Sequence, residues 1–219
     1  MNPRPTLLAA IALTAAAALS LSACGSDDSS KNKANDKIAG ADTSGEASAS
    51  PSRDESGAAG RPEITFPSDA KNVFEDAKTG DATKDAVLAD SALSVNSVDE
   101  AIFKGSTSTK ALGFYNTDKA LSSSITYVQR YIDSGDTWIG VTRYFDRKVT
   151  LSGDGQAYVS YCSDESKSFI KNRKTKKVDK SPADADSYVL YNSKLAKNTH
   201  GIWQTTAIVS KRGAKECQP

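Results

Sequence analysis

The stretch that decides the fold runs from Thr117 to Phe145 and reads TDKALSSSITYVQRYIDSGDTWIGVTRYF. In its first half, aliphatic residues recur at the three- and four-residue spacing of one helix face: Leu121, Ile125, Val128 and Ile132. After Ser134-Gly135-Asp136 the apolar residues alternate instead, which is typical of a strand. The chain therefore changes here from a helical half, capped at its start by Thr117 or Asp118, to a strand half.

Two more helices are predicted upstream of this stretch. The longer one opens near Thr83 and ends at Gly105, and it presents one apolar face: Leu88, Ala92, Val95, Val98 and Ile102. A shorter one follows Pro67, with Ser68 or Asp69 as its cap and Gly80 at its end. Its apolar residues are Val73, Phe74 and Ala77. The patch at 111–115 is apolar but predicts no particular structure.

Downstream, strands are predicted at 138–145, 148–151, 156–162, 188–195 and 202–210. Ser152-Gly153-Asp154-Gly155 supplies the turn of a hairpin, and the last two strands pair across the loop 196–201. The polar region between, 164–187, has one possible extended piece at 168–170. Helices followed by strands predict an α+β fold in which the helices cover one face of a curved antiparallel sheet.

Residues 1–23 have the three parts of a secretory signal: a positive start at Arg4, an apolar run, and small residues before Cys24. Leu21-Ser22-Ala23-Cys24 resembles the lipobox of bacterial lipoproteins, which implies that Cys24 is lipidated. The alternative, a transmembrane anchor, needs roughly 20 apolar residues, and this run is shorter and is interrupted by polar residues. We therefore expect a protein at the outer face of the cytoplasmic membrane, anchored to the membrane through lipid.

Residues 24–61 are predicted to form a disordered tether, since Ser, Ala, Gly and charged residues dominate and Ile38 is the one large aliphatic residue. The folded domain is predicted at 62–219, and trimming the chain to about residue 62 is expected to leave its stability unchanged. The net charge of the mature chain does not indicate a polyanionic partner. Arg4 is the one charged residue of the signal, so the mature chain carries 27 basic and 27 acidic residues. This balance argues against a general nucleic-acid binder.

With Cys24 assigned to lipid, two cysteines remain, Cys162 and Cys217. An even pair outside the cytoplasm predicts a disulfide. Two cysteines and a single histidine, His200, are too few for a usual structural zinc site, so neither a metal nor a cofactor is predicted.

Three helices followed by a long sheet whose last strand carries Gly201-Ile202-Trp203-Gln204 resemble the NTF2-like cone fold, over about residues 66–217. More narrowly, Tyr161-Cys162-Ser163-Asp164, that strand and Cys217 look like an uncharacterised group of actinobacterial secreted lipoproteins. The resemblance implies a topology that brings Cys217 beside Cys162. It also implies a pocket between the long helix and the concave sheet, and some NTF2-like members are enzymes that pair a carboxylate base with a Tyr or Asp acid.

Such a pocket would suit a small ligand that is apolar or of mixed polarity, and the alternative is a closed, packed core. The residues predicted to line it are Val95, Tyr115, Tyr144, Tyr161 and Trp203. No catalytic residue is assigned. Asp90 and Asp99 flank apolar positions of the long helix, where acids are usually solvated, and His200 lies in a turn without an orienting partner.

One dense basic run could touch anionic headgroups or wall polymers, or could be a solvated loop: Lys171, Arg173, Lys174, Lys176, Lys177 and Lys180. The predicted function is a membrane-anchored binding or assembly module, with a small apolar ligand or an envelope protein as partner. The alternative is a pocket enzyme of the isomerase or dehydratase kind. A deep pocket with a carboxylate within reach of a Tyr would favour the enzyme, whereas a closed core would favour the interaction protein.

Overall fold

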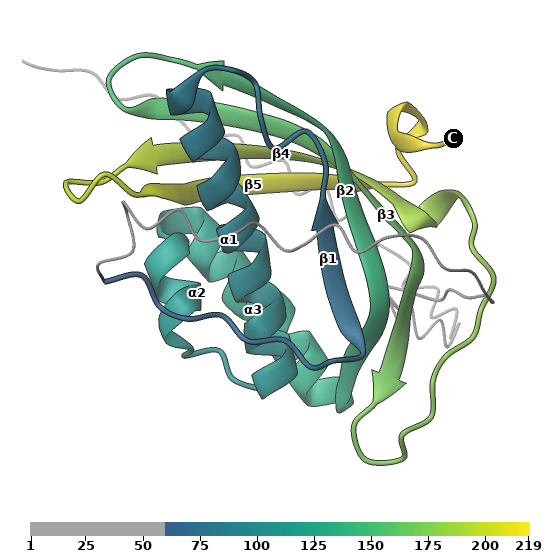
Figure 1. Cartoon of the computed structure of the whole chain (residues 1–219). Helices are drawn as coiled ribbons and strands as arrows, with labels where there is room; N and C mark the ends of the chain where they lie inside the picture. Colours follow the sequence, from purple (N-terminus) through teal and green to yellow (C-terminus); the bar gives the residue numbers. More distant parts are fainter. Residues whose placement is uncertain (1–59) are drawn as a thin grey trace, which may run out of the picture. The chain divides into compact units, whose positions relative to one another are not determined.

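The computed structural model describes residues 60–219, so the predicted signal peptide, Cys24 and nearly all of the predicted tether lie outside the described residues. Within them, three α-helices and five strands form one helical layer against one sheet (Figure 1). The elements are β1 (Ala70–Phe74), α1 (Ala82–Lys104), α2 (Lys110–Tyr115), α3 (Asp118–Ser134), β2 (Asp136–Leu151), β3 (Gln156–Asn172), β4 (Tyr188–Lys197) and β5 (Trp203–Arg212), with short 3-10 turns η2 (Ala185–Ser187) and η3 (Lys215–Cys217). The predicted α+β class is confirmed.

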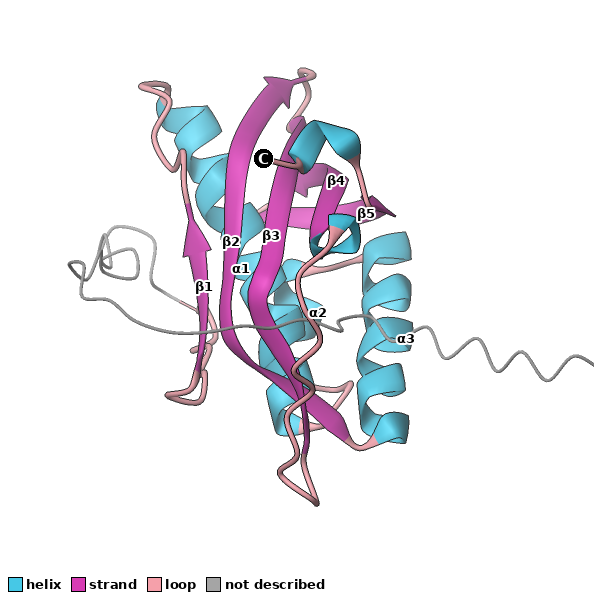
Figure 2. Cartoon of the chain, turned by 90° about the vertical axis from the view of Figure 1, so that its right-hand side faces the viewer, coloured by secondary structure: helices cyan, strands magenta, loops and turns pink. Residues whose placement is uncertain are grey.

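The sheet has the order β1-β2-β3-β4-β5, and β2 to β5 form an antiparallel meander. The prediction of a wholly antiparallel sheet is corrected at one edge, where β1 pairs in parallel with β2. The long strands β2 and β3 bend strongly, as Figure 2 shows. Two register shifts accompany this curvature. β3 has one extra residue between Asp164 and Lys167, and β2 has one between Phe145 and Lys148. Bulges of this kind bend the strand that carries them.

The short helix predicted after Pro67 is wrong, because residues 70–74 form β1. Ala70 pairs with Gly140 and Phe74 pairs with Tyr144, whose ring stacks on Phe74 at 4.7 Å between centroids. Three apolar residues could not separate helix from strand, and the ladder and the ring stacking outweigh local helix propensity. The partner strand β2 requires a glycine at position 140 for its pairing with β3: Gly140 has φ +96°, and a Cβ there would clash with the carbonyl oxygen of Lys167 in β3.

The long helix is confirmed as α1. Asp81 caps its start by accepting from the backbone N–H groups of Thr83 and Lys84, and Gly105 ends it in the left-handed conformation. The apolar patch at 111–115 is α2, which Thr109 caps. The third helix is confirmed as α3, but its buried face is rotated from the predicted one, since Ile125 is 38% exposed. The buried residues of α3 are Ala120, Ser124, Val128 and Tyr131.

The order of the predicted strands is confirmed, but β2 and β3 are longer than predicted. The two predicted segments 138–145 and 148–151 are one strand, β2, which is continuous through its bulge. β3 extends from the hairpin turn to Asn172 and so includes the extended piece predicted at 168–170. In β3, Ala157, Val159 and Tyr161 pack in the same core as Val87 and Leu88 of α1.

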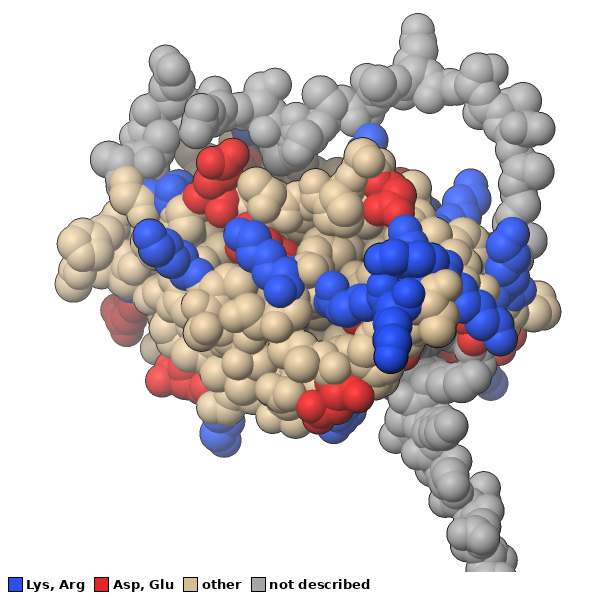
Figure 3. All heavy atoms as spheres, turned by 90° about the horizontal axis from the view of Figure 1, so that it is seen from below, with Lys and Arg blue, Asp and Glu red and all other residues tan. Residues whose placement is uncertain are grey.

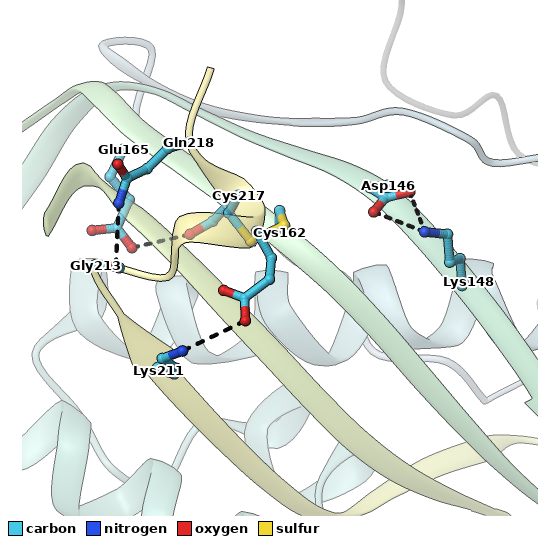
Figure 4. Close-up of a disulfide and its surroundings, with 10 residues drawn as sticks. Asp146, Lys148, Cys162, Glu165, Lys211, Gly213, Cys217 and Gln218 are labelled. Carbon is cyan, nitrogen blue, oxygen red and sulfur yellow. Dashed lines mark hydrogen bonds and ion pairs between the residues drawn. A yellow bond between two sulfur atoms is a disulfide. The ribbon is translucent and has the colours of Figure 1, made fainter. Parts of the chain in front are cut away.

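The disulfide between Cys162 and Cys217 is present, with Cα atoms 5.5 Å apart. Because Tyr161 packs toward α1, the alternation of a strand places Cys162 on the opposite face of the sheet. There Phe145 and Leu190 pack against the two cysteines, and the bridge holds the turn η3 on the sheet, as Figure 4 shows. The C-terminus is thus pinned to the face that the helices leave uncovered.

Candidate functional site

A cavity of about 440 Å³ lies between the helices and the concave face of the sheet. α1 contributes Val95, Val98 and Asp99, and the sheet contributes rings from β2, β3 and β4. Exposed residues at the mouth come from α3 and β5, among them Arg130 and Val209. The cavity therefore opens between the third helix and the edge strand of the sheet.

Asp99 is the carboxylate that α1 presents to this cavity. Its Oδ1 accepts a hydrogen bond from the Trp138 indole N–H at 3.1 Å, and its Oδ2 accepts one from the Asn72 amide at 2.7 Å. Burial raises the pKa of Asp99 to about 7, the two hydrogen bonds lower it, and the nearby Glu165 carboxylate raises it. A carboxyl group with this pKa can both accept and donate a proton near neutral pH.

Glu165 of β3 is the second acid that lines the cavity, and it is already paired. Arg212 of β5 donates to its Oε2 at 2.7 Å, and the Ser163 hydroxyl donates to its Oε1 at 3.3 Å. Arg212 also donates to the Asp186 carbonyl. Although burial lowers the pKa of Arg212, the pairing with Glu165 raises that pKa by more, so that Arg212 stays charged. The charge of Glu165 is thus balanced within the chain.

Tyrosine is the most frequent ring in the cavity wall. The lining tyrosines are Tyr127 and Tyr131 from α3, Tyr144 from β2, Tyr161 from β3 and Tyr191 from β4. Burial raises the pKa of each phenol, to about 12 for Tyr161, so all five remain protonated at neutral pH. The hydroxyls of Tyr127 and Tyr131 lie 3.3 Å apart.

Several hydroxyls of the wall are almost fully buried but have no hydrogen-bond partner among residues 60–219. Tyr144 is 8% exposed and Ser168 is 2% exposed, and neither side chain forms a hydrogen bond within the described chain. Ser124 and Thr142 share this property. The oxygen atoms of these hydroxyls are not among the fully buried polar atoms that lack a partner, so they are accessible from the cavity and can form hydrogen bonds with water or a ligand there.

Asp90, the other acid considered on this helix, lies outside the cavity. It is 2% exposed, and its Oδ1 accepts from Arg61 Nη1 at 2.5 Å while its Oδ2 accepts from the Trp203 backbone N–H at 2.8 Å. Arg61 also reaches the Tyr115 hydroxyl at 3.4 Å. Asp90 therefore joins the N-terminal segment, α1 and β5 and has a structural role.

This contact moves the start of the packed domain to Arg61, one residue into the predicted tether. Residues 61–66, here called the N-terminal strap, lead into β1, and Figure 1 shows them crossing the helical layer. Within the strap, the Thr65 backbone N–H donates to Glu100 at 3.0 Å, and Phe66 packs on Phe103 at 4.9 Å between centroids. The strap is thus held to α1 at both of its ends.

The cavity contains three of the five predicted pocket residues: Val95, Tyr144 and Tyr161. Tyr115 and Trp203 lie outside it, in the packed core, at 1% and 3% exposure. The expectation that Asp90 is solvated is wrong, whereas Asp99 is half-buried and lines the cavity. His200 is exposed, as expected, in the turn between β4 and β5.

The main residue that the sequence analysis undervalued is Asp99, and a signal for it existed. The apolar face of α1 continues from Val95 to Ile102 through position 99, at spacings of four and three. An acid at a position that the helical repeat assigns to the buried face is a candidate site residue. Glu165 and the Tyr127–Tyr131 pair carried no comparable signal, because their approach depends on the bend of β3 and the rotation of α3.

The basic run is divided by the fold. Lys171 pairs with Asp69 at 2.7 Å, and Arg173 donates to the carbonyls of Ile102 and Phe103 at the end of α1. Lys174, Lys176 and Lys177 are exposed, as is Lys180. Figure 3 views the side on which this loop lies in Figure 1, and Lys and Arg side chains gather over part of that face.

No family model matches the chain, and no curated protein matches it. Solved structures do match at low identity. A ketosteroid isomerase-like protein from Erwinia carotovora atroseptica is 14% identical, with 58% of this chain and 93% of that chain covered and a TM-score of 0.40. The protein Aln2 from a Streptomyces species is 12% identical, with 62% and 94% covered and a TM-score of 0.39.

The intermembrane space region of the chloroplast protein ARC6 is 11% identical, with 62% and 99% covered and a TM-score of 0.33. At such identities and TM-scores these proteins give no argument about the activity of this chain. Among residues 60–219, no helix is both long and apolar enough to span a membrane, and no cluster of three or more His, Cys, Asp or Glu side chains could hold a metal ion.

Proposed function

We propose that the mature chain is a lipoprotein, anchored through Cys24 at the outer face of the cytoplasmic membrane, whose NTF2-like domain binds a small molecule in the cavity. The observation that carries the proposal is the cavity itself. Its volume of about 440 Å³ is that of an ordinary ligand site, and such sites combine apolar and aromatic walls with a few placed polar groups. The NTF2-like assignment is supported by the order of elements and by the position of the cavity between α1 and the concave sheet.

Binding of a neutral aromatic fluorophore tests the cavity as a ligand site. N-phenyl-1-naphthylamine should become fluorescent with the mature chain. Ser124 lines the cavity from α3 and is 6% exposed, so Ser124→Phe should fill the space and abolish the signal. Ser122→Phe, on the exposed side of the same helix, is the matched control. Equal fluorescence in wild type and Ser124→Phe would contradict the proposal.

A proton-transfer enzyme is the second candidate, and Asp99 favours it. A carboxyl group of pKa about 7 beside a cavity is suited to abstract a proton next to a carbonyl group and return it elsewhere. However, the hydrogen bonds to Asp99 come from Asn72 and Trp138 rather than from a tyrosine. The arrangement of carboxylate and phenol expected for the enzyme is therefore incomplete. Exchange of the α-protons of a cyclic ketone into D2O, lost in Asp99→Asn, would support the enzyme.

The anchor is tested separately. Cys24→Ala should abolish labelling of the chain by fatty-acid analogues and leave the precursor uncleaved by the lipoprotein route. Persistent labelling of that variant would contradict the lipid anchor. The exposed lysines of the loop after β3 could add contact with anionic lipid, and this stays a prediction.

A further inference from the structure

The charges around the cavity are unequally balanced. Glu165 has its cation in Arg212, whereas in the described part of the chain no Lys or Arg forms an ion pair with Asp99. Arg130 lies at the exposed mouth, on α3. The interior thus contains one acid whose charge the chain leaves uncompensated, and a ligand that enters it meets negative charge.

The other groups of the wall also favour a cation. The hydroxyls of Tyr144 and Ser168 line the cavity without a hydrogen-bond partner among residues 60–219, and their oxygens can accept hydrogen bonds from a ligand. Trp138 and the five tyrosines line the same space, and the faces of aromatic rings attract ammonium groups. Carboxylate, hydroxyl oxygens and rings together form the kind of surface that recognises an organic amine.

We infer that the cavity takes an organic ammonium ion, with its charged nitrogen at Asp99 and its apolar part against the aromatic walls. This inference rests on the proposed function, since it names the class of the ligand bound there. An anionic ligand would place its charge beside Asp99 and Glu165, with Arg212 already engaged. A neutral ligand would leave the ionised Asp99 buried without a counter-charge, which is costly in a protein interior.

Binding of a cation should depend on pH. The groups around Asp99 are Asn72 from β1, Trp138 and Tyr144 from β2, Glu165 and Tyr161 from β3, and Tyr127 and Tyr131 from α3. None of them carries a positive charge, Glu165 is held by Arg212, and Arg130, the cation in the cavity lining, lies at the exposed mouth. Burial raises the pKa of Asp99 to about 7, so the cation must displace a proton below this pH and affinity should fall as the medium becomes more acidic.

The experiment compares three probes that share one apolar body and differ in charge: 3-phenylpropylammonium, 3-phenylpropan-1-ol and 3-phenylpropanoate. Calorimetry on the mature chain at pH 8 should show the ammonium binding at least roughly tenfold tighter than the alcohol, and no binding of the carboxylate. At pH 5.5 the preference for the ammonium should shrink. Equal affinity for ammonium and alcohol at pH 8, or tighter binding of the carboxylate, would overturn the inference.

Asp99→Asn should reduce the preference for the ammonium at pH 8, whereas Asp133→Asn, which changes an exposed acid of α3, should preserve it. A similar loss in both variants would mean a long-range effect of net charge and would overturn the role of Asp99. The outcomes separate the two proposals. If the alcohol binds as well as the ammonium, or if N-phenyl-1-naphthylamine binds and none of the three probes does, the inference fails and the cavity remains a ligand site of another class. If N-phenyl-1-naphthylamine does not bind either, the proposed function fails together with the inference.

Discussion

Asp90 and Asp99 are two acids on one helix, nine positions apart, and their surroundings differ in what neutralises them. Asp90 has a cation, Arg61, and a backbone N–H donor, and it lies in packed protein. Asp99 has two uncharged donors and faces a cavity. Asp90 therefore has its counter-charge within the chain, whereas a counter-charge for Asp99 would have to come from a bound ligand.

The contrast between Asp90 and Asp99 distinguishes an acid with a structural role from an acid with a role in binding or catalysis. A buried acid paired with a cation joins elements, and losing one partner leaves the other desolvated. A buried acid without a cation has its pKa raised toward neutrality, at a cost to stability that selection tolerates at sites of binding or catalysis. The two positions should therefore respond in opposite directions to loss of charge.

The largest effect is expected from Arg61→Met. This change keeps the length of the side chain but leaves Asp90, whose side chain is 3% exposed, without its cation. We expect a loss of about 3 kcal/mol in the free energy of unfolding, the low end for breaking a buried pair, because Arg61 is itself 25% exposed. Urea denaturation of the two proteins measures this loss.

Lys148→Met is the matched control, since Lys148 pairs with Asp146 at the surface, where such pairs contribute about 0–1 kcal/mol. A second route to the same contact is truncation. A chain that begins at Gly60 should be as stable as the mature protein, whereas one that begins at Pro62 should show most of the loss seen in Arg61→Met. Equal stability of the two truncated chains would show that Arg61 does not stabilise the domain, and the domain would then begin at the predicted residue 62.

The next effect is the pH dependence that Asp99 gives to stability. Its pKa is raised from 3.8 in the unfolded chain to about 7 in the folded one, so the folded state binds the proton more tightly. Stability from this group is therefore present at low pH and is lost as pH rises between these two values. We expect the difference in unfolding free energy between wild type and Asp99→Asn to change by about 2 kcal/mol from pH 5 to pH 8. A flat difference would contradict the raised pKa.

The same substitution at both acids gives the direct contrast. At pH 8, Asp99→Asn removes a buried charge and should stabilise the fold by roughly 1 kcal/mol, after allowance for one hydrogen bond that the amide cannot accept. Asp90→Asn should destabilise it by about 2 kcal/mol or more, because Arg61 loses its counter-charge. Thermal unfolding at one pH is sufficient, and shifts of the same sign would refute the distinction.

Much of this architecture could be predicted because it is encoded locally. α1 and α3 follow from helical periodicity and from Gly105 and Gly135, and the hairpin 152–155 follows from its glycines. The strand β1 could not be predicted in this way, because five residues acquire their structure from the edge of β2. Its formation is a tertiary effect, and Asn72 reaches Asp99 through it.

The site was less predictable than the fold, for a related reason. Periodicity identifies the buried face of a helix, but it does not show whether the side chain of an acid beside that face points into packed protein, a cavity or solvent. Arg61 shows the limit well: a basic residue at the end of a polar tract has the composition of a tether, and its partner lies 29 positions away. Long-range pairing of this kind needs the relative placement of segments that local sequence does not contain.

The smallest expected effect concerns the two donors that hold Asp99. Trp138→Phe removes the indole N–H while keeping an aromatic ring against Phe66 and Phe103, and Asn72→Ala removes the amide donor. Both donors stabilise the ionised carboxylate and lower its pKa, so losing either should raise the pKa of Asp99 further. A hydrogen bond contributes about 1 kcal/mol net, which corresponds to an increase of roughly half to one pH unit. Asn72→Ala should have the larger effect, because its bond is shorter, at 2.7 Å against 3.1 Å.

Titration of the Asp99 carboxyl carbon by 13C NMR measures both variants, with Asp133 as an exposed internal reference. If either variant lowers the pKa of Asp99, water that enters the space left by the side chain solvates the charge better than the lost donor did, and Asp99 would then resemble an ordinary surface acid more than the isolated cavity group inferred here.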